Sequence, residues 1–314
     1  MTTPKLITHA SQATPEWLTS VLRYAGYEGQ VSDVSMKSIG TGQVGENVRF
    51  TLAGEGIPES VVGKFASSDP TSKQTGIDQK NYIREVFYYK EIDSTVDIQT
   101  PRVLFTDCEE SSHDFVIMME DLAPGEQGDQ LAGCSVDEAA LALEELARLQ
   151  GPRWGDSTLK QYPLLSGSMS EDNAGVLQGL YKMVEPGFLA RYAERLTPEY
   201  LNMVKLVGDK LLSYSTSWEG PSTLIHIDYR LDNMMFGGPH PLTVVDWQSI
   251  SLGCGLLDAS YFVGTSLQPE LRAKEERHLL KHYLDVLRSY KVELSDDDAF
   301  TFYRNFAPAG LIMA

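Results

Sequence analysis

Residues 224–248 read LIHIDYRLDNMMFGGPHPLTVVDWQ, and this stretch decides how the rest of the chain is interpreted. Most of it is apolar, as expected of strands in a protein core. Its polar members include His226, Asp228, Asn233 and Asp246. Such groups are seldom buried alone, because desolvation costs more than an unpaired group recovers. We therefore expect these side chains to have a chemical role.

The stretch divides into a polar loop and two short apolar strands. HIDYRLDN is the loop, and MMF and LTVVDW are the strands on either side of the turn GGPHP. A hairpin closed at this turn pairs Asn233 with Asp246 and leaves Asp228 on the loop just before them. Two neighbouring oxygen ligands, a carboxamide and a carboxylate, beside a second carboxylate suit Mg²⁺, which prefers hard oxygens and few protein ligands. Asp228 can then accept a proton from a substrate hydroxyl.

The spacing of these residues resembles a known catalytic motif. HIDYRLDN followed by VVDW resembles the H-x-D-x-x-x-x-N loop and the metal-binding Asp of protein-kinase-like enzymes. It looks like the aminoglycoside phosphotransferase and choline kinase branch, whose members phosphorylate small molecules. With GLLDASYF after it, the stretch is also similar to the kinase-like domains associated with acyl-CoA dehydrogenases and to the ecdysteroid-kinase-like group. The alternative is two exposed polar turns and a chance match.

The resemblance assigns roles to individual residues. It implies that Asp228 is the catalytic base and that Asn233 and Asp246 bind the metal ion. Asp258, in GLLDASYF, becomes a structural residue that supports the catalytic loop. Ile227 stands where the family usually has the glycine of H-G-D, at a position that is not a ligand.

A glycine-rich stretch near the N-terminus fits the same family. GTGQVG supplies Gly40, Gly42 and Gly45 in a G-x-G-x-x-G pattern, which Rossmann folds also use. A Rossmann loop opens a helix and is followed by an acidic residue about 20 positions later. Here two strands follow, and Phe65 stands at that distance. We therefore expect a hairpin tip whose backbone N–H groups approach nucleotide phosphates; an ordinary glycine-rich turn is the alternative.

Lys64 lies in the strand-like segment VVGKF, where a buried lysine would need a partner. By resemblance, this strand lysine contacts the nucleotide phosphates and pairs with a glutamate on a helix. Glu85 in IREVFYY is the first candidate for that partner, and Glu91 is the second. A solvent-exposed lysine without a role is the alternative.

The resemblance implies an α+β, bilobal protein-kinase-like fold. We expect a small lobe with an antiparallel β-sheet in residues 1–120, which binds the nucleotide. A larger, mainly helical catalytic and substrate lobe is expected in 121–314. The hinge falls in VIMMEDLAPG, at about 119–125, where the backbone of Glu120 and Leu122 is expected to bind the adenine.

Local patterns predict the individual elements. Val48, Phe50 and Leu52 alternate as in a half-buried strand. Ser135 and Glu138 form a capping box at the start of a helix. Further helices are expected over 78–92, 170–194, 197–216, 267–290 and 295–308.

The composition is that of a globular protein with an acidic balance. The 314 residues include 26 Lys or Arg and 44 Asp or Glu, which gives a net charge of −18. This argues against binding to nucleic acid or to an anionic membrane surface, since both require clustered basic residues. Residues 107–145 contain 12 acidic and no basic residues. They indicate either a solvated face or a rim that attracts a cationic ligand.

The sequence shows no pattern of a disulfide framework, a signal peptide or a membrane span. Cys108, Cys134 and Cys254 are odd in number and widely separated, so neither a disulfide framework nor a zinc site is expected. The N-terminal residues do not have the pattern of a signal peptide, and no apolar run is long enough to span a membrane. We therefore expect a cytoplasmic protein.

Together these features predict a small-molecule kinase that uses ATP, with GTP as the alternative nucleotide, and Mg²⁺. It transfers the γ-phosphate to a hydroxyl group. A protein acceptor is not expected, because WQSISLGCGLL, between Asp246 and Asp258, is too short for an activation segment and no A-P-E motif follows. The alternatives are a non-catalytic kinase-like binder of a nucleotide or metabolite, a kinase of a hydroxyacyl-CoA or sterol-type alcohol, and a metal-dependent hydrolase using His226, Asp228 and Asp246.

Overall fold

The computed structural model describes residues 2–40, 44–165 and 171–313. The chain divides into two compact units. The first unit consists of Met1–Thr95, Gln99–Glu126 and Met235–Ser249, and the second of Val96–Ile98, Gln127–Met234 and Ile250–Ala314. The assignment of a nucleotide-binding lobe to 1–120 and of a substrate lobe to 121–314 stays a proposal.

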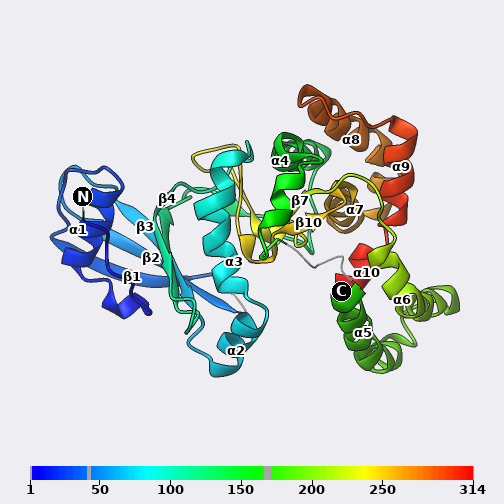
Figure 1. The fold of residues 1–314 in the computed structure, drawn as a ribbon, viewed down its shortest axis with the longest axis horizontal. Coiled ribbons are helices and arrows are strands. Elements are labelled where there is room, and N and C mark those ends of the chain that lie inside the picture. The colour runs from blue at the N-terminus through cyan, green and yellow to red at the C-terminus, as the bar shows by residue number, and fades with distance from the viewer. Residues whose placement is uncertain (1, 41–43, 166–170, 314) are drawn as a thin grey trace. The chain divides into compact units, whose positions relative to one another are not determined.

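The first unit is built around an antiparallel five-stranded sheet with the order β1-β2-β3-β5-β4 (Figure 1). Its strands are β1 (Asp33–Ile39), β2 (Gly45–Ala53), β3 (Ser60–Ala66), β4 (Val103–Cys108) and β5 (Phe115–Glu120). Ile39 pairs with Asn47 across β1 and β2. Gly40 and Gly45 therefore flank the tip of a hairpin, as predicted.

The inner strand β3 is buried on both faces of the sheet, to which its successive side chains point in turn, whereas β1 is largely exposed. The helices of the unit are α1 (Pro15–Tyr24), α2 (Pro70–Asp78) and α3 (Asn81–Phe87). On one face, Phe65 of β3 belongs to the same apolar cluster as Leu18 of α1. On the other face, Val62 of β3 packs with Val86 of α3. Figure 1 shows α1 and α3 on the two sides of the sheet.

The helix predicted over 78–92 begins later than expected. Lys80 has a φ of 58°, a left-handed conformation that interrupts the helical backbone between α2 and α3. After α3, the chain continues in a π-helical turn, Tyr88–Ile92. The prediction was therefore correct for 81–92 and wrong for Gln79 and Lys80, while Asp78 is the last residue of the preceding helix α2.

The hairpin predicted at GGPHP is confirmed. β8 (Met234–Phe236) lies between β6 (Glu126–Gln127) and β9 (Leu242–Val244) in a three-stranded sheet. In the turn, the N–H of Gly237 donates to the carbonyl of Pro241 at 3.1 Å. Gly237 has a φ of 69°, a conformation that glycine adopts without steric cost.

The second unit is mainly helical. Its helices are α4 (Val136–Gln150), α5 (Glu171–Tyr192), α6 (Pro198–Thr216), α7 (Gly255–Ser266), α8 (Pro269–Ser289), α9 (Asp296–Asn305) and α10 (Ala309–Met313). β7 (Thr223–Ile225) pairs with β10 (Ser251–Gly253) in antiparallel fashion. The predicted capping box is confirmed, since the hydroxyl of Ser135 accepts from the N–H of Glu138 and the Glu138 carboxylate accepts from the N–H of Ser135.

Helices α5, α6 and α8 match the predicted ranges to within two residues. Helix α9 ends at Asn305, before the predicted end at 308, and α7 was not predicted. Most side chains of α7 are buried, and they include Asp258 and Tyr261. A helix that is buried on nearly all sides lacks the polar face that gives an amphipathic helix its period in the sequence. The α+β class with an antiparallel sheet is confirmed.

The acidic stretch 107–145 is divided between the two units: its first part belongs to the first unit and its second part to the second. Carboxylates of the first part pair with basic side chains: Asp107 with Lys90, Asp114 with Lys73 and Asp121 with Arg49. Part of the stretch is therefore neutralised by the protein's own cations.

Two further findings concern the chain as a whole. In the parts of the chain that the structure describes, no helix combines the length and apolarity needed to cross a membrane. Cys108, Cys134 and Cys254 are free thiols.

Candidate active site

Lys64 is held inside the first unit by its position on β3. Val62 and Ala66 belong to the apolar cluster on the side of α3, and the alternation of a strand turns Lys64 to the same side. Only 8% of Lys64 is exposed. A buried ammonium group requires anionic partners. The partners of Lys64 must therefore lie on the side of the sheet that α3 covers.

Lys64 bridges two carboxylates. Its Nζ lies 2.7 Å from Oε2 of Glu85 on α3 and 2.8 Å from Oδ1 of Asp246. The predicted pair with Glu85 is thereby confirmed, and the second candidate, Glu91, is an exposed residue. Burial lowers the pKa of Lys64, but the charges of Asp246 and Glu85 outweigh it and the pKa is raised. Lys64 therefore keeps its positive charge at physiological pH.

Glu85 faces the sheet because of its place on α3. Tyr82, Glu85 and Val86 are all buried and lie three and four positions apart, which is one face of a helix. Only 2% of Glu85 is exposed. Burial raises the pKa of Glu85, and the ion pair with Lys64 works in the opposite direction. The ionised form of Glu85 is therefore stabilised by the positive charge of Lys64.

The segment after β9 is fixed against α3 and the turn that follows it. The indole of Trp247 stacks on the ring of Tyr88 with centroids 3.8 Å apart. The carbonyl of Gln248 accepts a hydrogen bond from Nη1 of Arg84 at 3.1 Å. Between these anchors, Asp246 has a left-handed backbone with a φ of 68°, which aspartate tolerates better than most residues. The side chain of Asp246 is thus aimed at Lys64 by its neighbours.

The glycine-rich loop uses two of its glycines in different ways. Gly40 has a φ of 72°, in the left-handed region that favours glycine. A β-carbon on Gly45 would lie 3.3 Å from Cε of Lys64, so the missing side chain lets the loop end approach the lysine closely. Gly42 lies outside the described residues.

The hinge candidates lie at the end of β5. The N–H of Glu120 donates to the carbonyl of Arg102 at 3.0 Å, and its carboxylate accepts from the N–H of Arg102 at 2.7 Å. The carbonyl of Leu122 accepts from the N–H of Gly125 at 2.8 Å, and the Leu122 side chain is buried. The proposed adenine contacts therefore fall to the carbonyl of Glu120 and the N–H of Leu122.

Asp228 lies in the second unit, on the loop between β7 and β8. Nδ2 of Asn233 donates to the carbonyl of Asp228 at 2.8 Å and to its Oδ2 at 2.9 Å. Nε of Arg230 lies 3.2 Å from the other carboxylate oxygen, Oδ1. The hydroxyl of Tyr261 on α7 donates to the same Oδ1 at 3.4 Å. Both oxygens of Asp228 therefore have defined neighbours.

Asp258 fixes the backbone next to Asp228. Its Oδ2 accepts from the N–H of His226 at 2.6 Å, and its Oδ1 accepts from the N–H of Ile227 at 2.9 Å. These bonds hold Ile227 at a φ of 71°, which is strongly disfavoured for a β-branched side chain. Burial raises the pKa of Asp258 to about 7, although the two N–H bonds oppose the rise. Asp258 thus supports the loop as the resemblance implies.

Two further contacts of this loop were missed in the sequence. The hydroxyl of the fully buried Tyr229 donates to the carbonyl of Ala142 on α4 at 2.6 Å. Oε1 of Gln130 accepts from the N–H of Leu231 at 2.8 Å. Tyr229 gave a signal, because it is a large aromatic residue within a polar motif. Gln130 gave none, since it lies in a segment without periodicity.

The structure gathers the candidate residues in two groups, one in each unit. Lys64, Glu85 and Asp246 form the first group, and Asp228 and Asn233 form the second. The atom types fit Mg²⁺, because the amide nitrogen of Asn233 donates to Asp228, and its carbonyl oxygen is an atom of the kind that Mg²⁺ prefers. Binding of one metal ion by Asn233 and Asp246 together stays a proposal. Among the residues that the structure describes, the candidate site included, no three His, Cys, Asp or Glu side chains gather as metal ligands.

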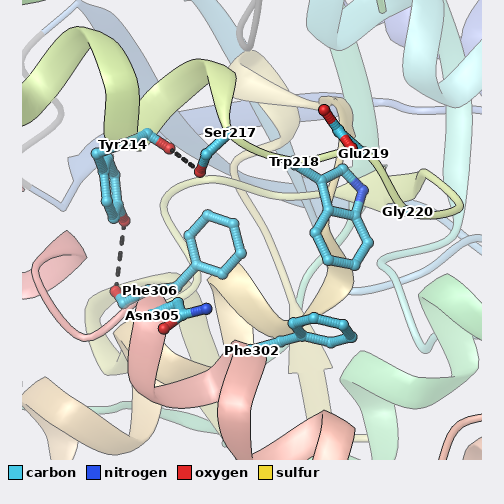
Figure 2. A pocket seen from close by; sticks show the side chains of 8 residues that line it. All are labelled: Tyr214, Ser217, Trp218, Glu219, Gly220, Phe302, Asn305 and Phe306. Atoms are coloured by element: carbon cyan, nitrogen blue, oxygen red, sulfur yellow. Dashed lines mark hydrogen bonds between the residues drawn. The ribbon is translucent and has the colours of Figure 1, made fainter.

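A separate pocket of about 280 Å³ lies in the second unit, and none of the predicted site residues lines it. Figure 2 shows the rings of Trp218, Phe302 and Phe306 around it. The hydroxyl of Tyr214 donates to the carbonyl of Phe306, and that of Ser217 donates to the carbonyl of Tyr214. Both hydroxyls therefore bind backbone carbonyls of the protein itself, and the pocket is lined by aromatic rings together with the polar residues Ser217, Glu219 and Asn305.

Comparison with known proteins agrees with the motif in the opening stretch. Residues 166–295 match the model of the Ecdysteroid kinase-like family. The matched range contains Asp228, Asn233, Asp246 and Asp258, and it excludes Lys64 and the glycine-rich loop. Among curated proteins, no match to the chain was found.

Solved structures extend the similarity to most of the chain. Choline kinase from Cryptosporidium parvum Iowa II has a TM-score of 0.58 and 10% identity, over 96% of this chain and 84% of that chain. Spectinomycin phosphotransferase, APH(9)-Ia, in complex with ADP and spectinomycin has a TM-score of 0.53 and 12% identity, over 94% and 85%. The gentamicin–APH(2")-IIa complex has a TM-score of 0.52 and 18% identity, over 98% and 95%. The predicted resemblance to the kinase-like fold of small-molecule kinases is thereby confirmed.

Proposed function

We propose that the protein is an ATP-dependent phosphotransferase that phosphorylates a hydroxyl group of a small molecule and uses Mg²⁺. The observation that carries the proposal is the buried Lys64, whose amine contacts both Glu85 and Asp246. Burying such a charge is costly unless its partners are well placed. A fixed ammonium group beside a carboxylate is suited to a nucleotide triphosphate and its metal ion. The kinase-like fold supports the same conclusion.

We assign the nucleotide phosphates to the first unit. Lys64 would contact them, and Glu85 would hold the lysine in place. The loop formed by Gly40, Gly42 and Gly45 would cover the phosphates with its backbone N–H groups. The three glycines matter because a β-carbon would keep the backbone at a distance.

The purine ring is assigned to the end of β5. The carbonyl of Glu120 and the N–H of Leu122 offer one acceptor and one donor to the edge of an adenine. The structure of spectinomycin phosphotransferase contains ADP, which supports an adenine nucleotide. GTP is the alternative, and a direct comparison of the two nucleotides decides between them.

Asn233 and Asp246 are the residues that would hold Mg²⁺, through a carbonyl and a carboxylate oxygen. When bound, the ion would neutralise charge on the phosphate oxygens. Asp246 contacts Lys64 in the structure, so the same carboxylate would serve both the metal ion and the lysine. Loss of Asp246 should therefore affect nucleotide binding as well as turnover.

Asp228 is proposed to act on the acceptor. The acceptor hydroxyl gives its proton to the Asp228 carboxylate, and its oxygen forms a new bond to the γ-phosphorus. The bond between that phosphorus and the β,γ-bridging oxygen breaks, and ADP leaves. Most of the rate enhancement would come from positioning and from charge neutralisation, as in other phosphoryl transfers.

A small acceptor fits the short segment between Asp246 and Asp258. Related kinases of this fold act on different molecules, as the names choline kinase and spectinomycin phosphotransferase indicate. The hydrolase alternative, which uses His226, Asp228 and Asp246, would give the glycine-rich loop no role. It would also leave Lys64 without a role.

The proposal is tested by ADP release from Mg²⁺·ATP in the presence of a library of hydroxylated metabolites. Once an acceptor is found, Asp228→Ala should lower turnover by about 10²–10⁴-fold and leave ATP affinity unchanged. Asp246→Asn should weaken both. Asp297→Ala, at an exposed site on α9, is the control and should behave as the wild type. ATP binding without turnover on any acceptor would favour the non-catalytic binder instead.

A further inference from the structure

Helix α7 carries two residues that reach the same loop. Asp258 and Tyr261 are three positions apart and therefore lie on one face of the helix. Asp258 binds the backbone N–H groups of His226 and Ile227. One turn later, the hydroxyl of Tyr261 reaches Oδ1 of Asp228 at 3.4 Å. The helix thus contacts both the backbone and the carboxylate of the loop.

The contacts of the Asp228 carboxylate differ in how well they can fix it. Asn233 holds Oδ2, but it belongs to the same loop as Asp228 and so does not fix the carboxylate relative to the helices. The side chain of Arg230 is 37% exposed, and an ion pair open to water constrains little. Tyr261 is 5% exposed and projects from a buried helix. Among the contacts of Asp228 named above, the one with Tyr261 is therefore anchored outside the loop and shielded from water.

We propose that Tyr261 is a positioning residue, which orients the carboxylate of Asp228 toward the acceptor hydroxyl. This inference rests on the proposed function, in which Asp228 is the base. A catalytic group must be held within about 10–20° of its productive orientation. Donors on both carboxylate oxygens, one from the loop and one from α7, fix the plane of the group. The bond of 3.4 Å is long, as catalytic hydrogen bonds often are before the substrate binds.

The chemistry of the phenol suits this role. Burial raises the pKa of Tyr261 to about 12, and the neighbouring Asp228 carboxylate contributes to the rise. The hydroxyl therefore keeps its proton in the neutral pH range and can act as a donor to Asp228.

A double-mutant cycle tests the inference, with ADP release from Mg²⁺·ATP measured on the acceptor that the library identifies, or on water. Tyr261→Phe should lower kcat by about tenfold, with the KM for ATP unchanged. In an Asp228→Asn background, the same change should have no further effect on kcat, because the tyrosine acts through the carboxylate. Tyr303→Phe is the matched control, since Tyr303 is also 5% exposed in the second unit and donates to a carboxylate, that of Glu276. It should leave kcat unchanged.

Three results would overturn the inference. They are a wild-type kcat for Tyr261→Phe, an equal loss in the wild-type and Asp228→Asn backgrounds, and an equal loss for Tyr303→Phe. A failure of the proposed function has a different signature. In that case Asp228→Asn itself would keep its turnover, whatever the effect of the tyrosine.

Discussion

Two residues at the candidate site have a left-handed backbone conformation, which residues other than glycine seldom adopt. Ile227 precedes Asp228 with a φ of 71°, and Asp246 has a φ of 68°. Neighbouring contacts fix both backbones. The Asp258 carboxylate binds the N–H of Ile227, and Trp247, the residue after Asp246, stacks on Tyr88. Strain of this kind persists only where the surrounding structure enforces it, and it is common at functional sites.

The strain at Ile227 predicts an unusual order of stability. Ile227→Gly should be more stable than Ile227→Ala by about 1 kcal/mol, because alanine keeps the steric penalty of the left-handed region and glycine does not. At an ordinary helical site the order is reversed. Ala190→Gly, at an exposed site in α5, is the control and should cost about 1 kcal/mol. Urea denaturation of the variants measures both differences, and an Ile227→Ala variant more stable than Ile227→Gly would contradict the strain.

Lys64 predicts a loss of stability as well as of function. Lys64→Met leaves the buried Glu85 without its cation, and removing one partner of a buried ion pair costs about 3–5 kcal/mol. Lys90→Met is the control, because the pair of Lys90 with Asp107 is exposed and contributes little. Thermal denaturation compares the two variants. Equal melting temperatures would mean that the Lys64 pair is not a buried structural contact.

At the scale of elements, α5 and α7 are opposite cases. α5 contains Gly175, Gly179 and Gly187 and an internal Pro186, all weak helix formers, and many of its apolar side chains are exposed. α7 is buried on nearly all sides. Elements with few buried contacts open at low free energy. We therefore expect the amides of α5 to exchange with deuterium at least tenfold faster than those of α7, as measured by mass spectrometry. Similar protection in the two helices would contradict this.

At the scale of the whole molecule, Asp258 links stability to pH. Its pKa of about 7 lies above the value of 3.8 expected in an unfolded chain. The folded state therefore binds the proton more tightly, and this contribution to stability is present at low pH and lost as the pH rises toward 7. Relative to Asp258→Asn, which does not titrate, the wild type should lose up to about 4 kcal/mol between pH 4 and pH 8. Urea denaturation at several pH values measures this difference, and parallel curves for the two proteins would exclude the link.

The sequence by itself determined the parts of the protein that depend on local chemistry. The alternation of Val48, Phe50 and Leu52 predicted a strand, and the capping box at Ser135 predicted the start of α4. Caps and periods are properties of neighbouring residues, so they can be read without knowledge of the fold. The motif HIDYRLDN and the lysine of VVGKF pointed to the kinase-like fold for the same reason. Each lies within a single element, one loop and one strand, so its residues are close together in the sequence.

The tertiary structure decided the contacts between residues that are distant in the chain. Asp258 was expected from the sequence to support the loop. The structure shows that it does so from α7, by accepting hydrogen bonds from the N–H groups of His226 and Ile227. Two hydrogen bonds of the loop had no local signal in the sequence. One joins Gln130 to the N–H of Leu231, and the other joins the hydroxyl of Tyr261 to Asp228. A helix that is buried on nearly all sides shows no amphipathic period in its sequence. A polar contact between residues far apart in the chain produces no recognisable spacing of residues in the sequence. Such contacts are set by packing, and packing exists only in the folded molecule.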